Sequence, residues 1–337
     1  MGGGAPLLPE TGAALVVRRA VRNWLGAYAA PNTEVAVALS GGADSLALTA
    51  AAVAEAGAVH ALVVDHRLQA GSGRIAEVAA EAALELGCAS ATVLPVEVTG
   101  PGGMEAAARA ARYAALDGAR AGQQVLLGHT MDDQAETVLL GLARGSGPRS
   151  VRGMAPHSPP WGRPLLAVRR ADTVGLCADL GLRPHVDPHN SAPEFTRVRL
   201  RHEVLPLLED VLGGGVAAAL ARTAAQLRED TAVLDDLAAE LLSTARTAGT
   251  GPHPDLAVPP LGTAPAALRR RAIRSWLLEA GARPPGDTTL RAVDALIVRW
   301  RGQGAVAVGG GTPARRLVVE REHGRLTLRL RGRADGA

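Results

Sequence analysis

Residues 40–45, with the sequence Ser-Gly-Gly-Ala-Asp-Ser, have the types and order that bind phosphate groups. The apolar residues 35–39 predict a buried strand before them, and Asp44 begins an Ala- and Leu-rich stretch that predicts a helix. Two glycines let the backbone approach an anion closely, and the first turn of a helix offers unpaired N–H groups. Because Asp44 would repel a phosphate unless a cation lay between them, we expect a magnesium ion beside it. A serine-capped helix after an ordinary turn is the alternative interpretation.

A second polar cluster follows a later predicted strand and opens another helix. It comprises His129, Thr130, Asp132, Asp133 and Glu136. Thr130 and Asp133 fit a capping pattern, in which each side chain bonds the backbone N–H group of the other residue. Capping accounts for Asp133 alone and not for so many polar side chains at one edge of a sheet. We therefore interpret the cluster as part of a functional site.

Arginines gather in two further places. Arg109 and Arg112 are three residues apart and share one face of a predicted helix. Glu105 precedes Arg109 by four residues, so a surface ion pair is the simpler interpretation of these side chains. The second group comprises Arg197, Arg199 and Arg201. It is interpreted equally well as a phosphate-binding patch or as a solvated helix face.

The first half of the chain alternates strands and helices, which places these clusters in space. The predicted strands are 35–39, 58–65, 91–98 and 124–128, and the predicted helices are 13–28, 44 onward, 75–86, 104–121 and 132–143. This alternation predicts an α/β fold with a doubly wound parallel sheet, covered by helices on both faces. Because parallel strands end at one edge of a sheet, we expect residues 40–45, 65–67 and 129–133 to meet there.

The second half is predicted to be mainly helical. Its expected elements, in order, are a functional loop at 144–170, a helix at 171–181, a turn at 187–190, a helical stretch at 194–247 that breaks at 213–215, a linker at 248–260, helices at 265–280 and 287–300, and a small β-hairpin within 305–330. We therefore expect a catalytic domain at 1–212, followed by a smaller, mainly helical domain at 213–337.

Composition limits the available chemistry. All 36 basic side chains among the 337 residues are arginine, so neither a lysine Schiff base nor a Walker A loop can form. Cys88 and Cys177 are far apart in the sequence, which makes a disulfide framework, a zinc knuckle or an iron–sulfur site unexpected. A net charge of +3 permits a polyanionic partner. We expect no membrane span, no signal peptide and a cytoplasmic location.

The ordered motifs resemble those of the tRNA(Ile)-lysidine synthases, a family of the PP-loop ATP pyrophosphatase superfamily. The resemblance covers residues 33–212. It is carried by 40–45, 64–68, Glu105, Arg109, Arg112-Tyr113, Gly128-His129, 132–137, 144–147, Gly153-Met154, 163–166, Asp187-Pro188 with Asn190, and Arg197, Arg201 and 205–207. The first motif alone marks only the superfamily, whereas the ordered series is far more specific.

This resemblance implies an ATP-dependent modification of the wobble cytidine in the CAU anticodon of an isoleucine tRNA. ATP would adenylate the carbonyl at C2 of the base and release pyrophosphate. The amine of free L-lysine would then attack that carbon, and AMP would leave. The implied cofactors are ATP and Mg²⁺, the implied partners are tRNA(Ile) and L-lysine, and a homodimer is left open.

The resemblance also implies roles for particular residues. The implied ATP-binding residues are Ser40, Gly41, Gly42, Ala43, Asp44 and Ser45. The implied catalytic residues are Asp44, Arg109, His129, Asp133 and Glu136. Among them, Asp44 and Asp133 would hold magnesium, and Glu136 would bind the lysine ammonium and accept its proton. The implied contacts to substrate or RNA are Arg112, Arg197 and Arg201.

The chain departs from the family pattern in places, and two other hypotheses remain. Thr130 stands where many members have a second histidine, and Val198 and Gln69 replace a common asparagine and a common basic residue. A tRNA thiolase of the same superfamily, acting on cytidine or uridine, is the second hypothesis, although such enzymes generally use paired cysteines. A nucleotide-binding module without catalysis is the third, and the acidic cluster argues against it.

Overall fold

The computed structural model describes residues 8–69, 71–100, 103–145, 147–185, 195–248, 253–312 and 314–332, so the turn expected at 187–190 lies outside it. The chain forms two compact units. The first combines residues 1–143 with 151–225, and the second combines 144–150 with 226–337. The domain bounds expected from the sequence, 1–212 and 213–337, remain a prediction. Relative to them, the first unit extends into helix α10 (Val216–Ala245), and a short segment before residue 151 belongs to the second unit.

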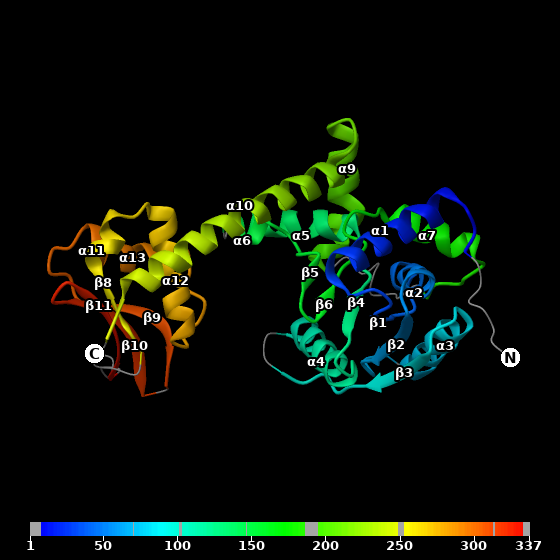
Figure 1. Ribbon diagram of the computed structural model, residues 1–337, viewed down its shortest axis with the longest axis horizontal. Coiled ribbons are helices and arrows are strands. Elements are labelled where there is room, and N and C mark those ends of the chain that lie inside the picture. The colour runs from blue at the N-terminus through cyan, green and yellow to red at the C-terminus, as the bar shows by residue number, and fades with distance from the viewer. Residues whose placement is uncertain are drawn as a thin grey trace. The chain divides into compact units, whose positions relative to one another are not determined.

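A six-stranded sheet forms the centre of the first unit (Figure 1). Its strands are β1 (Glu34–Ala38), β2 (Ala58–Asp65), β3 (Ser90–Pro95), β4 (Gln124–Leu127), β5 (His157–Ser158) and β6 (Trp161–Gly162). They follow the order β3-β2-β1-β4-β6-β5, and all neighbours are parallel except β5 and β6. The predicted doubly wound sheet is confirmed. Its strand order reverses between β1 and β4, which is where such sheets bind ligands.

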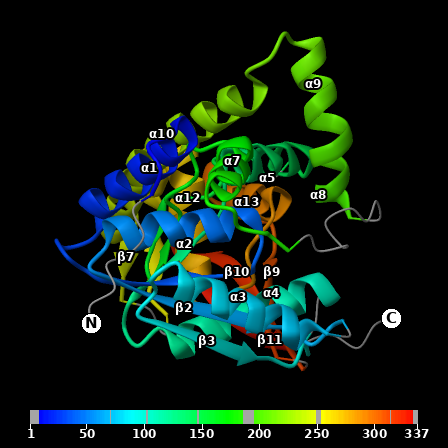
Figure 2. The same cartoon turned by 90° about the vertical axis from the view of Figure 1, so that its right-hand side faces the viewer.

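Helices cover both faces of this sheet. One face carries α1 (Gly12–Tyr28), α2 (Ala43–Glu55), α3 (Ser72–Glu85) and α7 (Arg170–Asp179), with α1 and α2 packed side by side (Figure 2). The other face carries α4 (Met104–Ala119), whose buried Leu116 packs with Ala36 and Val125. Val35 and Val37 belong to the first core and Ala36 to the second, as the alternation of side chains along a strand requires.

The helices after β4 complete the first unit. They are α5 (Met131–Ala143), α8 (Thr196–Arg199), a π-helix (Leu200–Val204), α9 (Leu205–Val211) and the start of α10, and the short α6 (Pro148–Val151) lies at the boundary of the two units. The predicted break at 213–215 is confirmed, because all three glycines there have positive φ angles. Among the described residues no single helix is long and apolar enough to cross a membrane. One bent pair of helices, Thr196–Val211 with Val216–Ala245, is long and apolar enough when the two are taken together, by length and composition alone.

The second unit contains a larger sheet than the sequence predicted. Its strands are β7 (Arg246–Thr247), β8 (Asp255–Ala257), β9 (Val306–Gly311), β10 (Arg315–Glu322) and β11 (Arg325–Gly332), and its helices are the remainder of α10, α11 (Val258–Thr263), α12 (Ala266–Glu279) and α13 (Asp287–Val298). The expected hairpin is confirmed as β10 and β11, but it lies within a five-stranded antiparallel sheet of order β7-β8-β11-β10-β9. Of the three added strands, β7 and β8 are too short to show an alternating pattern, and the second half of β9 consists of three glycines.

Candidate active site

The turn between β1 and α2 has a backbone geometry that requires glycine. Gly41 has a φ of +80°, which L side chains rarely adopt, and its carbonyl accepts the backbone N–H group of His185 at 2.9 Å. Ser45 Oγ donates to the Gly42 carbonyl at 2.9 Å and accepts the Ser40 N–H group at 3.2 Å, which fixes the loop. No side-chain oxygen caps α2, so the N–H groups of Ala43 and Asp44 in its first turn remain available to an anion, whereas the Ser45 N–H group donates to the Gly42 carbonyl at 3.1 Å.

A second glycine allows β4 to end against the first turn of α2. A Cβ atom at Gly128 would lie 3.1 Å from backbone atoms of Asp44 and Ser45, which is tighter than nine in ten real Cβ contacts. With any other residue here, β4 and the turn would have to move apart by a few tenths of an ångström. Because α5 begins directly after β4, this close approach brings the polar cluster of α5 beside the turn that follows β1.

Asp133 has a different partner for each of its two carboxylate oxygens. Oδ2 accepts the Thr130 N–H group at 2.8 Å and the Thr130 hydroxyl at 3.0 Å, so the capping interpretation is confirmed for this atom. Oδ1 accepts instead from Arg170 Nη2 at 2.6 Å and from Arg201 Nη2 at 3.1 Å. Capping therefore explains one oxygen, and the other faces a pair of guanidinium groups.

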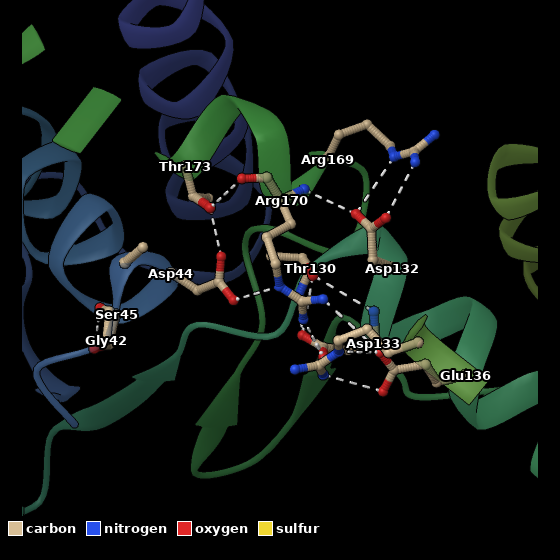
Figure 3. Close-up of polar contacts among 12 residues, drawn as sticks. Gly42, Asp44, Ser45, Thr130, Asp132, Asp133, Glu136, Arg169, Arg170 and Thr173 are labelled. Carbon is tan, nitrogen blue, oxygen red and sulfur yellow. Dashed lines mark hydrogen bonds and ion pairs between the residues drawn. The ribbon is translucent and has the colours of Figure 1, made fainter. Parts of the chain in front are cut away.

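Arg170 and Arg201 connect carboxylates from separate elements. Figure 3 shows Arg170 between Asp44 and Asp133. Arg170 Nε lies 3.2 Å from Asp44 Oδ2 on α2, and Arg170 Nη1 lies 3.8 Å from Glu136 Oε1 on α5. Arg201 Nε, in the π-helix, donates to Glu136 Oε1 at 2.7 Å. Thr173 donates its hydroxyl to Asp44 Oδ1. The result is one network of alternating charges at the switch point of the sheet.

Asp132 anchors the start of α7 to the start of α5. Its Oδ2 accepts the backbone N–H group of Arg170 at 2.8 Å, and its Oδ1 lies 3.1 Å from Arg169 Nη2. Two consecutive arginines at a helix N-terminus are electrostatically unfavourable, because that end of the helix dipole is positive. The carboxylate of Asp132 and those bound by Arg170 offset this cost.

Burial and charge shift the pKa values of the network in opposite directions. Burial raises the pKa of Glu136 above its ordinary value, although the hydrogen bond from Arg201 opposes this shift. Burial likewise raises the pKa of Asp44, and Arg170 opposes it. Burial acts in the same sense on Asp133, but Arg170 and the Thr130 N–H group outweigh it and hold the pKa of that carboxyl below its usual range. Glu136 is therefore a better proton acceptor than Asp133.

His129 lies beside the network as a neutral side chain. Burial lowers its pKa to about 4, Asp133 opposes this shift, and Arg163, Arg112 and Arg109 lower it further. Its Nδ1 atom is buried and has no hydrogen-bond partner among the described residues. A buried polar atom without a partner is expensive in an isolated protein, which is consistent with a ligand at this position.

The structure unites only part of the set expected from the sequence. Asp44, Asp133, Glu136 and Arg201 share the network, and His129 adjoins it. The guanidinium groups of Arg109 and Arg112 lie 4.9 Å and 5.7 Å from the ring centre of Tyr113 on α4. Arg197 is exposed on α8. Arg109, Arg112 and Arg197 therefore lie outside the ion-pair network.

Arg170 and Thr173 belong to the network but were not among the residues expected from the sequence. The pair Arg169-Arg170 at the start of a predicted helix could have indicated them. Cations are disfavoured at a helix N-terminus, and a residue that violates a local preference often occupies a functional position. The three-residue spacing from Arg170 to Thr173 then places both on one face of that helix.

The carboxylates can supply part of the coordination of a magnesium ion, which water or phosphate groups would complete. No group of three or more metal-binding side chains occurs within the described part of the chain. Magnesium, however, is commonly held by one or two carboxylates together with water and substrate phosphates. Asp44 and Asp133 supply two hard oxygen ligands that face the same guanidinium group, beside the uncapped start of α2.

Comparisons with known proteins agree with this arrangement. Residues 15–208 match the family described as the PP-loop domain, and residues 256–327 match the TilS substrate binding domain. The tRNA(Ile)-lysidine synthase of Nocardia farcinica is 69% identical over 322 residues, covering 95% of this chain and 99% of that protein. The protein of the same name from Mycobacterium leprae is 54% identical over 325 residues, covering 95% and 98%.

Among solved structures, the U34-tRNA thiolase NcsA of Methanococcus maripaludis superposes with a TM-score of 0.52 over 64% of this chain and 80% of the thiolase. The two sequences are 18% identical, so this likeness concerns the fold alone. The sequence matches, in contrast, extend over nearly the whole length of both proteins and include both compact units. The chain therefore belongs to the tRNA(Ile)-lysidine synthase family and is built on the ATP-binding PP-loop domain.

Proposed function

We propose that this chain ligates lysine to C2 of the wobble cytidine in the CAU anticodon of an isoleucine tRNA, which forms lysidine. One observation carries the assignment: a tRNA(Ile)-lysidine synthase is 69% identical over 95% of the chain. ATP first adenylates the C2 carbonyl oxygen, and pyrophosphate leaves. The lysine amine then attacks C2, and the oxygen departs with AMP.

In this proposal the loop after β1 holds the triphosphate of ATP. Gly41 and Gly42 let the backbone approach the phosphates, and the N–H groups at the start of α2 donate to them. Ser40 and Ser45 already bond each other, at 3.1 Å between their hydroxyl oxygens, and present those hydroxyls at the same turn. Asp44 and Asp133 would hold a magnesium ion, which supplies neutralising charge for the departing pyrophosphate.

The acid–base network suits the lysine substrate, which carries both signs of charge. Glu136 is fully buried and its pKa is raised, so its carboxylate can bind an ammonium group and accept a proton before the amine attacks. Arg201 holds that carboxylate at 2.7 Å and offers a cationic partner for the lysine carboxylate. His129 would position the base, and its neutral ring with an unpaired buried nitrogen supports this role.

Arg112 on α4 and Arg197, which is exposed on α8, are proposed contacts to RNA. Arg109, also on α4, is proposed to be catalytic, because its guanidinium group would neutralise charge on the departing pyrophosphate. Residues 256–327, which match a substrate binding domain, are proposed to contact the tRNA outside the anticodon. The cytoplasmic location and a homodimer, the latter testable by sedimentation, complete this proposal.

The thiolase alternative is weaker on structural grounds. Both cysteines of the chain are buried and free. Burial raises the pKa of Cys88 to about 11, and burial together with Asp44 raises that of Cys177 to about 11. Thiols that resist ionisation are poor nucleophiles and poor metal ligands at neutral pH.

A direct test supplies the purified chain with ATP, magnesium, radiolabelled lysine and a cytidine-bearing tRNA(Ile) transcript. We expect label in the RNA and release of AMP that depends on both lysine and the tRNA. A methionine tRNA with the same anticodon serves as the control for specificity. Label that never enters the isoleucine transcript would show the assignment to be wrong.

A further inference from the structure

A single guanidinium group occupies the centre of the carboxylate cluster. Arg170 reaches Asp44 Oδ2 through Nε at 3.2 Å and Asp133 Oδ1 through Nη2 at 2.6 Å (Figure 3). The two carboxylates belong to different helices, and Arg170 belongs to a third. Its planar fork is what allows one side chain to serve two acceptors at once.

The start of α7 holds Arg170 in this position by backbone as well as side-chain contacts. Its N–H group donates to Asp132, and its carbonyl oxygen lies 2.8 Å from Thr173 Oγ1, whose single proton is donated to Asp44.

We propose that Arg170 is the internal counter-ion of the site, which holds Asp44 and Asp133 in register and gives them up when a divalent cation binds. The inference rests on the proposed function, in which these two carboxylates are the metal ligands. Asp44 Oδ2 and Asp133 Oδ1 both accept from the Arg170 guanidinium group, so these two oxygens face the same position in the site. A divalent ion and a guanidinium group within a few ångströms of each other repel strongly in a partly buried site.

Arg170 therefore acts as a positioning residue with a predictable effect on metal affinity. While it is bound, it keeps two neighbouring carboxylates from repelling each other and closes the cation position. Its removal should weaken the metal-free protein and, at the same time, strengthen binding of a divalent ion. A purely structural role predicts only the first effect, because general loosening of a site does not improve its affinity for metal.

The test measures Mn²⁺ affinity without nucleotide, by electron paramagnetic resonance of free Mn²⁺, in the full-length chain. We expect Arg170→Gln to bind Mn²⁺ at least about tenfold more tightly than the unmodified chain. Arg169→Gln is the matched control, because its neighbouring guanidinium contacts Asp132 and Glu209. Its Mn²⁺ affinity should stay within about twofold of the unmodified chain. In melting experiments, Mn²⁺ should restore most of the stability that Arg170→Gln loses in EDTA.

Arg170→Lys covers the case in which the glutamine variant fails to fold. A lysine keeps the charge but cannot bind two carboxylates with a planar fork. The Mn²⁺ affinity of Arg170→Lys should therefore lie between that of the unmodified chain and that of Arg170→Gln. Equal affinity in the unmodified chain and both Arg170 variants overturns the inference and leaves the proposed function standing. Absence of Mn²⁺ binding in every protein overturns both this inference and the proposed metal site, whereas lysine incorporation into tRNA tests the ligase assignment separately.

Discussion

Replacing Asp133 with asparagine separates the two contributions of this side chain. The carboxylate accepts from Thr130 through Oδ2 and from Arg170 and Arg201 through Oδ1. An asparagine retains one acceptor oxygen, and its amide group turns the other position into a donor. Charge-assisted bonds are the stronger ones, so we expect the remaining oxygen to face the arginines. The amide group then opposes the Thr130 N–H group and the cap is lost.

The expected cost in stability follows from these contacts. Loss of a helix cap costs about 1 kcal/mol. Removing one partner of a buried ion pair costs about 3–5 kcal/mol, but here the loss is smaller, because Arg170 retains Asp44 and Arg201 retains Glu136. We expect a total of about 2–3 kcal/mol, which corresponds to a melting temperature lower by about 5–10 °C. Turnover should fall by at least about 100-fold, because the variant loses a charge that faces the reacting groups.

Thr130→Val is the matched control, since it removes the capping hydroxyl and preserves the shape of a fully buried side chain. It should cost about 1 kcal/mol and leave turnover within about threefold of the unmodified chain. Melting is followed by circular dichroism, and turnover by lysine-dependent AMP release with saturating tRNA. An Asp133→Asn protein that melts earlier but turns over at the normal rate would refute the reasoning. Equal loss of turnover in both variants would likewise assign the effect to the cap.

Three further variants test other parts of the structure. Because burial lowers the pKa of His129 from 6.5 to about 4, the unfolded chain takes up a proton first as the pH falls, and stability is lost between about pH 6.5 and about pH 4. His129→Asn should lack that loss of about 3 kcal/mol in denaturant titrations, and a variant whose stability changes with pH as that of the unmodified chain does would contradict the assignment. Gly128→Ala places a Cβ 3.1 Å from the turn after β1 and should weaken ATP binding at least about tenfold by calorimetry, whereas Gly118→Ala, with nothing within 4 Å, should not. Asp294→Ala leaves the buried Arg269 without the carboxylate that accepts from its Nε at 2.5 Å and should destabilise the second unit by about 3 kcal/mol in scanning calorimetry, with ATP affinity unchanged. An unaltered transition would contradict a structural role for this pair.

The sequence by itself determined the elements of the first unit and the places where its chemistry lies. Strand β2 has the predicted bounds, and β1, β3 and β4 differ from theirs by a few residues at most. Apolar strand runs and alanine-rich helices are local patterns that a single sequence displays. The polar clusters at 40–45 and 129–136 could be placed together because parallel strands end at one edge of their sheet.

Only the tertiary structure decided how those residues combine. Arg170 and Asp44 are 126 positions apart, and they meet because α7 packs against α2 on one face of the sheet. The two functions of Asp133 and the five-stranded sheet of the second unit depend in the same way on distant partners. Ion pairs and short strands of this kind arise from packing between elements, and packing leaves no periodic signal in the sequence around any one of them.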